Sequence, residues 1–77
     1  MNILLVKNIA SDAATILENE LHDRRRSEPF HHLAERNDDR LAADLRAKLE
    51  QQLSSLVSAH PAVADQMKEL LARLNHL

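Results

Sequence analysis

The sequence predicts a small all-α protein, an antiparallel bundle of three helices, from three observations. The first is that the 77 residues contain no glycine and only two prolines, so residues that end helices or form tight turns are scarce. The second is a composition of 14 leucines and 11 alanines with one aromatic residue, Phe30. The third is a set of leucines at helical spacing: Leu41, Leu45, Leu49, Leu53 and Leu56. These observations predict a few long amphipathic helices and no sheet.

We expect the first helix over residues 3–25. Its apolar side would be formed by Ile3, Val6, Ala10, Ala13, Ala14, Leu17 and Leu21, which fall on one arc of a helical wheel. A short buried strand over residues 3–6 is the alternative, because a brief apolar run fits either structure. The helix would end in Arg24, Arg25 and Arg26, whose positive charges suit the carboxyl end of a helix dipole.

The second helix is expected over residues 28–59, with Ser27 as its cap and Pro29 in its first turn. Each four-residue step of the leucine row turns about 40°, so the row spreads over roughly 120° and can meet two neighbouring helices. It would be the spine of the bundle. Polar residues interrupt the apolar face at 37–39, and a break there would give four helices instead of three.

The third helix is expected over residues 61–76. His60 precedes Pro61, and a residue before proline disfavours helical backbone angles, so the second helix should stop there. The apolar stripe that follows is Val63, Met67, Leu70, Leu71, Leu74 and Leu77.

The wide apolar face of the first helix predicts a homodimer. Leu5, Ile9 and Ile16 widen its apolar face to nearly half the circumference, more than one antiparallel partner covers. A second copy, contacting the first and second helices, would cover the remainder. The alternative is a three-helix monomer with a hydrophobic docking groove.

Charge and cysteine content exclude several classes of protein. The net charge of -2 is far from that of a strongly basic nucleic-acid binder or an acidic DNA mimic. Without cysteine there are no disulfides and no thiolate metal sites. The apolar run Ile3–Val6 is too short for a signal peptide or a membrane span, so we expect a cytoplasmic protein without a membrane partner.

No pattern in the sequence predicts catalysis, a cofactor or a metal. On a helix, His31 with Glu35, or Glu28 with His32, would place two ligands one turn apart, but two ligands do not make a site. No nucleophile lies in an exposing turn, and no glycine-rich loop could hold a phosphate. We therefore expect a protein that is not an enzyme.

The concentrated charge at Arg24–Arg26 is the best candidate for contact with a partner. The candidate partner-binding residues are Arg24, Arg25, Arg26, Glu28, Phe30 and Glu35. We expect a small regulator or adaptor that binds a larger protein and blocks its surface, comparable in class to phage and plasmid inhibitors, antitoxins and chaperones. The alternative is a nucleic-acid-binding dimer that presents the arginine cluster twice. Arg24–Ser27 also matches a kinase site, although Ser27 is expected to cap a helix.

Overall fold

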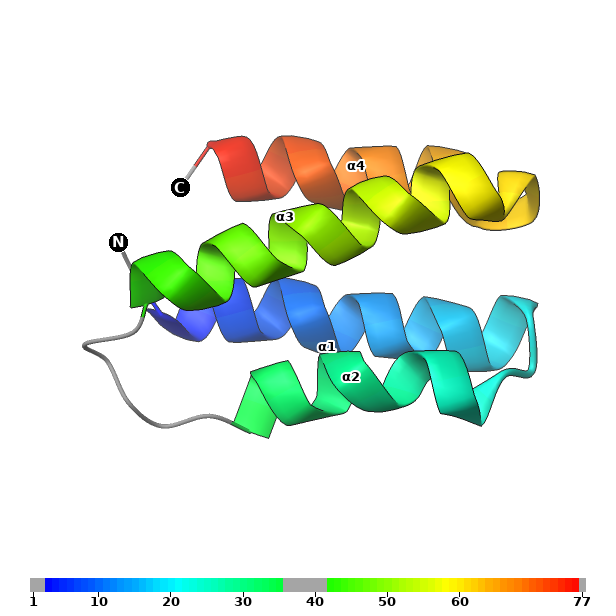
Figure 1. Cartoon of the computed structure of the whole chain (residues 1–77), viewed down its shortest axis with the longest axis horizontal. Coiled ribbons are helices and arrows are strands. Elements are labelled where there is room, and N and C mark those ends of the chain that lie inside the picture. Colours follow the sequence, from blue (N-terminus) through cyan, green and yellow to red (C-terminus); the bar gives the residue numbers. More distant parts are fainter. Residues whose placement is uncertain (1–2, 36–41, 77) are drawn as a thin grey trace.

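The computed structural model describes residues 3–35 and 42–76, which form two helical hairpins (Figure 1). In the first hairpin, α1 spans Ile3–Glu20 and α2 spans Arg24–Glu35. In the second, α3 spans Ala42–Ala59, a 3₁₀ turn covers Pro61–Val63, and α4 spans Ala64–Asn75. The described residues include no strand. The all-α prediction is confirmed, and the strand alternative for residues 3–6 is wrong.

The helix α1 contacts α2, α3, α4 and the 3₁₀ turn. Its buried side includes the small residues Ala10, Ala13 and Ala14. Alanine side chains let neighbouring helices approach closely, and a helix with contacts on several sides benefits from that. The leucine-rich α3, which we expected to be the spine of the bundle, also contacts all the other elements, so α1 and α3 share the central position.

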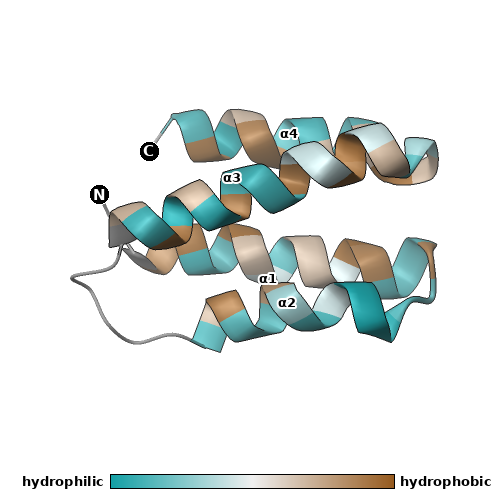
Figure 2. Ribbon diagram, viewed as in Figure 1, coloured by the Kyte–Doolittle hydropathy of each residue, from teal (hydrophilic) through white to brown (hydrophobic). Residues whose placement is uncertain are grey.

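The apolar stripes of the helices face one another and form a single core (Figure 2). Leu45, Leu49, Leu53 and Leu56 of α3 are buried, as their spacing predicts, whereas Leu41 lies outside the described residues. The other buried apolar residues are Val6, Ile9, Ala10, Ala13, Ala14, Leu17, Phe30, Leu33, Val63, Met67, Leu70 and Leu74.

The first helix ends earlier than the predicted residue 25, because the chain reverses at residues 21–23. His22 adopts a positive φ of 51°, in the left-handed region that glycine normally supplies at helix ends. The amides of Leu21 and Asp23 both donate to the Leu17 carbonyl oxygen, at 3.1 and 3.4 Å. A histidine therefore terminates α1 in a chain that has no glycine.

The expected helix over residues 28–59 is also corrected. At 1.5 Å per residue it would be about 48 Å long, but the longest dimension of the molecule is 33 Å. The segments α2 and α3 are therefore not parts of one straight helix. Residues 37–39, where the sequence allows a break, lie outside the described residues.

The second hairpin turns at His60, whose backbone angles, φ -132° and ψ 84°, lie outside the helical region that a following proline disfavours. Pro61 opens the 3₁₀ turn, and α4 follows it. The two hairpins are joined across α1 and α4 by an ion pair of 2.8 Å between Arg73 and Asp12. Within the described residues no helix is long and apolar enough to cross a membrane.

Candidate functional site

The candidate partner-binding residues all lie on α2, but they do not share one surface. The exposed candidates in the first half of the helix are Arg24, Arg25, Arg26 and Glu28. Glu35, the last residue of the helix, is also exposed. Phe30 is only 2% exposed and belongs to the core. In this conformation its side chain cannot insert into a partner, so Phe30 does not belong to an exposed contact surface.

The start of α2 is organised by Asp23, which acts as its N-cap. The Asp23 carboxylate accepts a hydrogen bond from the Arg26 backbone amide at 3.1 Å and another from Arg26 Nε at 2.8 Å. An N-cap acceptor satisfies an amide that has no partner inside the helix. Both bonds hold the pKa of the Asp23 carboxyl below its usual range, and the bond from the Arg26 backbone amide is the largest cause.

The three arginines therefore lie at the opposite helix end from the one predicted. They form the first turn of α2, where the helix dipole is positive and disfavours cations. The Asp23 carboxylate compensates part of this unfavourable charge. Ser27, which we expected to cap the helix, lies inside it and is 1% exposed.

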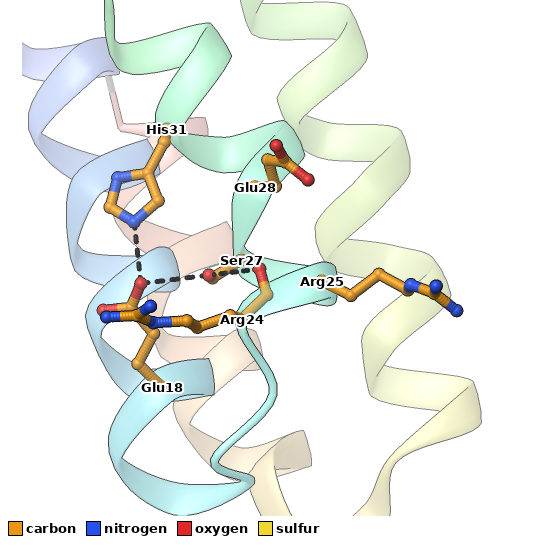
Figure 3. Close-up of a pocket in the computed structure, with 6 residues that line it drawn as sticks. All are labelled: Glu18, Arg24, Arg25, Ser27, Glu28 and His31. Atoms are coloured by element: carbon orange, nitrogen blue, oxygen red, sulfur yellow. Dashed lines mark hydrogen bonds and ion pairs between the residues drawn. The ribbon is translucent and has the colours of Figure 1, made fainter.

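A cluster of polar side chains joins α1 to α2 beside this turn (Figure 3). Glu18 Oε1 of α1 lies 2.8 Å from His31 Nε2 and accepts a hydrogen bond from Ser27 Oγ at 3.0 Å. The Ser27 hydroxyl also lies 2.8 Å from the Arg24 carbonyl oxygen. One hydroxyl has one proton, so these two acceptors share it. The buried serine is thus fully committed to the α1–α2 contact.

The pKa of the Glu18 carboxyl is lowered by this arrangement. The largest cause is the hydrogen bond from His31, followed by the bond from Ser27, while partial desolvation acts in the opposite direction. The charge of Arg24 contributes in the same sense as the hydrogen bonds. The site therefore favours an ionised Glu18 near neutral pH.

An open hollow of about 370 Å³ lies over the cluster and is lined by Glu18, Arg24, Arg25, Ser27, Glu28 and His31. The arginine side chains do not converge in it. Arg24 extends toward the Glu18 carboxylate, whereas Arg25 points to the other side of α2 (Figure 3). Arg26 is folded onto Asp23. The hollow consequently presents charges of both signs and not a concentrated positive patch.

The geometry of the cluster differs from that of a hydroxyl-activating triad. In such a triad the imidazole lies between the hydroxyl and the carboxylate and removes the hydroxyl proton. Here the Glu18 carboxylate lies between Ser27 and His31, so the imidazole does not contact the serine hydroxyl as it does in a triad. The arrangement fixes two helices relative to each other.

The histidine pairs considered as metal ligands are not assembled into a larger site. His31 pairs with Glu18 of α1 at 2.8 Å. Among residues 3–35 and 42–76, no three histidines or carboxylates come close enough to hold a metal ion.

Two residues of the candidate site, Asp23 and Glu18, were not predicted from the sequence. Asp23 did carry a signal, because an aspartate followed by a helix-forming segment is a typical N-cap. We did not predict this cap because the adjoining arginines are typical of the carboxyl end of a helix. Glu18 carried no local signal, because its partners His31 and Ser27 lie on another helix.

Comparison with protein-family models, with curated proteins and with solved structures finds no match to this chain. The fold and the site define a class only, a small helical bundle with a charged α1–α2 hairpin.

Proposed function

We propose that the protein is a non-enzymatic regulator or adaptor that binds a larger protein and blocks part of its surface, with the exposed side of α2 as the contact. The observation that carries this proposal is the mixture of charges on that side. Arg24 lies beside Glu18 and Glu28 around one open hollow, and Arg25, at its edge, extends to the other side of α2. Protein surfaces present both charge signs within such an area, and complementary pairs fix the register of docking.

The same observation counts against the alternative of a nucleic-acid-binding dimer. A phosphate backbone is a row of negative charges and is bound by basic groups that face one way. Successive residues on a helix point about 100° apart, so Arg24, Arg25 and Arg26 diverge. Carboxylates of Glu18 and Glu28 in the same hollow would repel phosphates.

The contact surface is well ordered for binding. Asp23 holds Arg26 and the first turn of α2, and Glu18 ties Ser27 and His31 to α1. Side chains and helices that are fixed before binding lose less conformational entropy when the complex forms. A small module of this kind can act by occupying a surface without changing shape.

The test is a pull-down from native lysate, with and without nuclease. A defined protein that is retained after nuclease treatment supports the proposal. If nuclease removes every captured species, or if binding to bare nucleic acid falls steeply with salt, the nucleic-acid alternative is favoured and this proposal fails.

A charge reversal locates the contact on α2. Arg25→Glu should weaken capture of the retained protein, and it should not unfold α2, because a carboxylate suits the first turn of a helix. Lys68→Glu, an exposed position on α4, makes the same charge change elsewhere and should leave capture unchanged. Equal capture by both variants would place the contact outside α2. Arg26 is kept in these variants because it pairs with Asp23.

Self-association is a separate part of the proposal. We expect a homodimer, but the apolar surface available to it is smaller than the sequence suggested, because Ile9 is buried and Ile16 is half-buried within one chain. Leu4 and Leu5 stay 64% and 44% exposed at the start of α1. Light scattering with refractive-index detection suits a chain without Trp or Tyr. A monomer mass at high protein concentration would contradict the dimer.

A further inference from the structure

The helix α2 is held in the bundle mainly by one neighbour. It packs along α1 and contacts α3 only sparsely. It also lies at the opposite edge of the molecule from α4 (Figure 1). Local unfolding of a protein starts in elements that few other elements hold in place. Separation of α2 from α1 would leave the contacts among α1, α3 and α4 intact.

The side of α2 that faces α1 buries little apolar surface. The buried residues of this helix are Ser27, Phe30 and Leu33. Two of the three are apolar, whereas the buried residues of α4, a helix of the same length, are Met67, Leu70 and Leu74. Burial of apolar side chains is a main source of helix packing energy. The hydrophobic effect therefore fixes α2 less firmly than α4.

The hydrogen bonding of α2 is interrupted by a proline. The Ser27 amide donates to the Asp23 carbonyl oxygen at 3.3 Å, which begins the helical pattern. Pro29 follows two residues later, in the second turn of α2 and not in the first turn, where we expected it. Because proline has no amide hydrogen, the Arg25 carbonyl oxygen does not receive the bond that a helix normally supplies from residue 29.

The length and the charge of α2 also disfavour an independent helix. It has 12 residues, and isolated helices of this length are only marginally stable in water. Its first turn carries three arginines at the positive end of the helix dipole. The contact with α1 therefore maintains the helix, and α2 would unfold when it leaves α1.

Glu18 of α1 contributes the polar contacts that hold α2 closed. Its Oε1 lies 2.8 Å from His31 Nε2 and 3.0 Å from Ser27 Oγ. The Glu18 side chain is only partly buried. Water can consequently replace both partners when α2 moves away, and opening leaves no unpaired charge in the core.

We propose that α2 opens from α1 by local unfolding, with the turn at residues 21–23 as its fixed end and Glu18 as the residue that holds it closed, while α1, α3 and α4 stay packed. The open form loses the mixed-charge hollow, because Glu18 lies on α1 and the other lining residues lie on α2. Opening also brings the buried Ser27 hydroxyl to the surface. The inference goes beyond partner binding, since it describes a motion of the protein alone that removes the contact surface.

The test is native-state hydrogen exchange of the full chain at neutral pH, measured for each amide by NMR at low urea concentrations. After correction for intrinsic rates, residues 30–33 should exchange about tenfold faster than residues 10–17 of α1 and 49–56 of α3. Their rates should also respond less to urea, because local opening exposes less surface than global unfolding. Equal rates and equal urea dependence in the three helices would show that α2 opens only with the whole molecule, and would overturn the proposal.

Two substitutions should change the opening of α2 in opposite directions. Glu18→Gln removes the charge that strengthens both hydrogen bonds, so it should raise the exchange rates of residues 30–33 roughly threefold. Pro29→Ala restores the missing helical amide and should lower these rates. Glu20→Gln, exposed on α1 and outside the hollow, is the matched control and should leave them unchanged. The same effect in Glu18→Gln and Glu20→Gln, or faster exchange in Pro29→Ala, would contradict the proposal.

The accessibility of Ser27 gives a second measure of the open form. A kinase that recognises arginines before serine serves as the probe, and its rate on the folded protein is divided by its rate on a peptide of residues 22–32. This ratio should be higher for Glu18→Gln than for Glu20→Gln, with circular dichroism melting to show that both variants are folded. Equal ratios would contradict the role of Glu18. Both measurements use the protein without a partner, so their failure rejects the opening of α2 and leaves the partner-binding proposal to its own test.

Discussion

Glu18 Oε1 on α1 and His31 Nε2 on α2 are 2.8 Å apart, and this contact joins the two helices beside the turn that connects them. The same Glu18 oxygen accepts a hydrogen bond from the buried Ser27 hydroxyl. A single carboxylate oxygen therefore holds two positions on α2, one turn apart. The ionisation of Glu18 should consequently affect how firmly the hairpin is closed.

The first prediction concerns the pH dependence of stability. The pKa of Glu18 is lower in the folded protein than the value of 4.5 for an unperturbed glutamate. Between the two values the unfolded chain binds more protons, so stability falls as the pH decreases through the folded pKa. The contribution is fully present above about pH 5. Urea unfolding followed by circular dichroism should show a larger midpoint difference between the parent and Glu18→Gln at neutral pH than at pH values near 3.

A matched variant tests the physical cause. Glu20, also on α1, is exposed and lies outside the hollow, so Glu20→Gln should show a smaller change between the two pH values. If Glu18→Gln and Glu20→Gln lose stability alike at both pH values, the hydrogen bonds from His31 and Ser27 do not stabilise the ionised carboxylate in solution.

The second prediction concerns the cap of α2. Asp23→Ala removes the acceptor for the Arg26 amide and leaves three cations uncompensated in the first helical turn, so it should lower the thermal midpoint. Asp23→Asn keeps a good N-cap acceptor and loses only the negative charge, so it should fall between the parent and Asp23→Ala. Equal midpoints for Asp23→Ala and the parent would show that the cap is not formed.

The third prediction concerns the left-handed residue that ends α1. A non-glycine residue in this region is strained by about 1 kcal/mol, so His22→Gly should stabilise the protein by up to about that amount. His22→Ala keeps the strain and should gain nothing. As a control, Glu69→Gly in the interior of α4 should destabilise by roughly 0.5 to 1 kcal/mol. Urea midpoints at neutral pH measure all three changes, and a loss of stability in His22→Gly would contradict the assignment of strain.

These residues show why part of the fold was predictable and part was not. The apolar spacing of Leu45 to Leu56 predicts burial correctly, because each helix must hide its apolar side wherever the other helices lie. The end of α1 was misplaced because the usual signal, glycine, is replaced by His22. The site was only partly predictable for a different reason. The arginines and Glu28 were found from local charge, but Glu18 joins them only through tertiary contact.

The fourth prediction concerns the kinase-like match at Ser27. The hydroxyl is buried and bonded within the α1–α2 contact, so a kinase that recognises arginines before serine cannot reach it without opening α2. A synthetic peptide covering residues 22–32 should be phosphorylated readily, and the folded protein much more slowly. Mass spectrometry of a time course measures both rates. Phosphorylation of the folded protein at the rate of the peptide would show that α2 opens easily.

The fifth prediction compares two leucines that carry the same substitution. Leu49 is fully buried in α3 and contributes to the common core, so Leu49→Ala should cost roughly 2 to 5 kcal/mol through lost burial and a residual cavity. That is a large part of the ~5 to 15 kcal/mol by which natural domains are stable. Leu4 is mostly exposed, so Leu4→Ala should change stability by less than about 0.5 kcal/mol. Urea unfolding measures both variants, and similar losses in the two would mean that α3 does not pack as the structure shows.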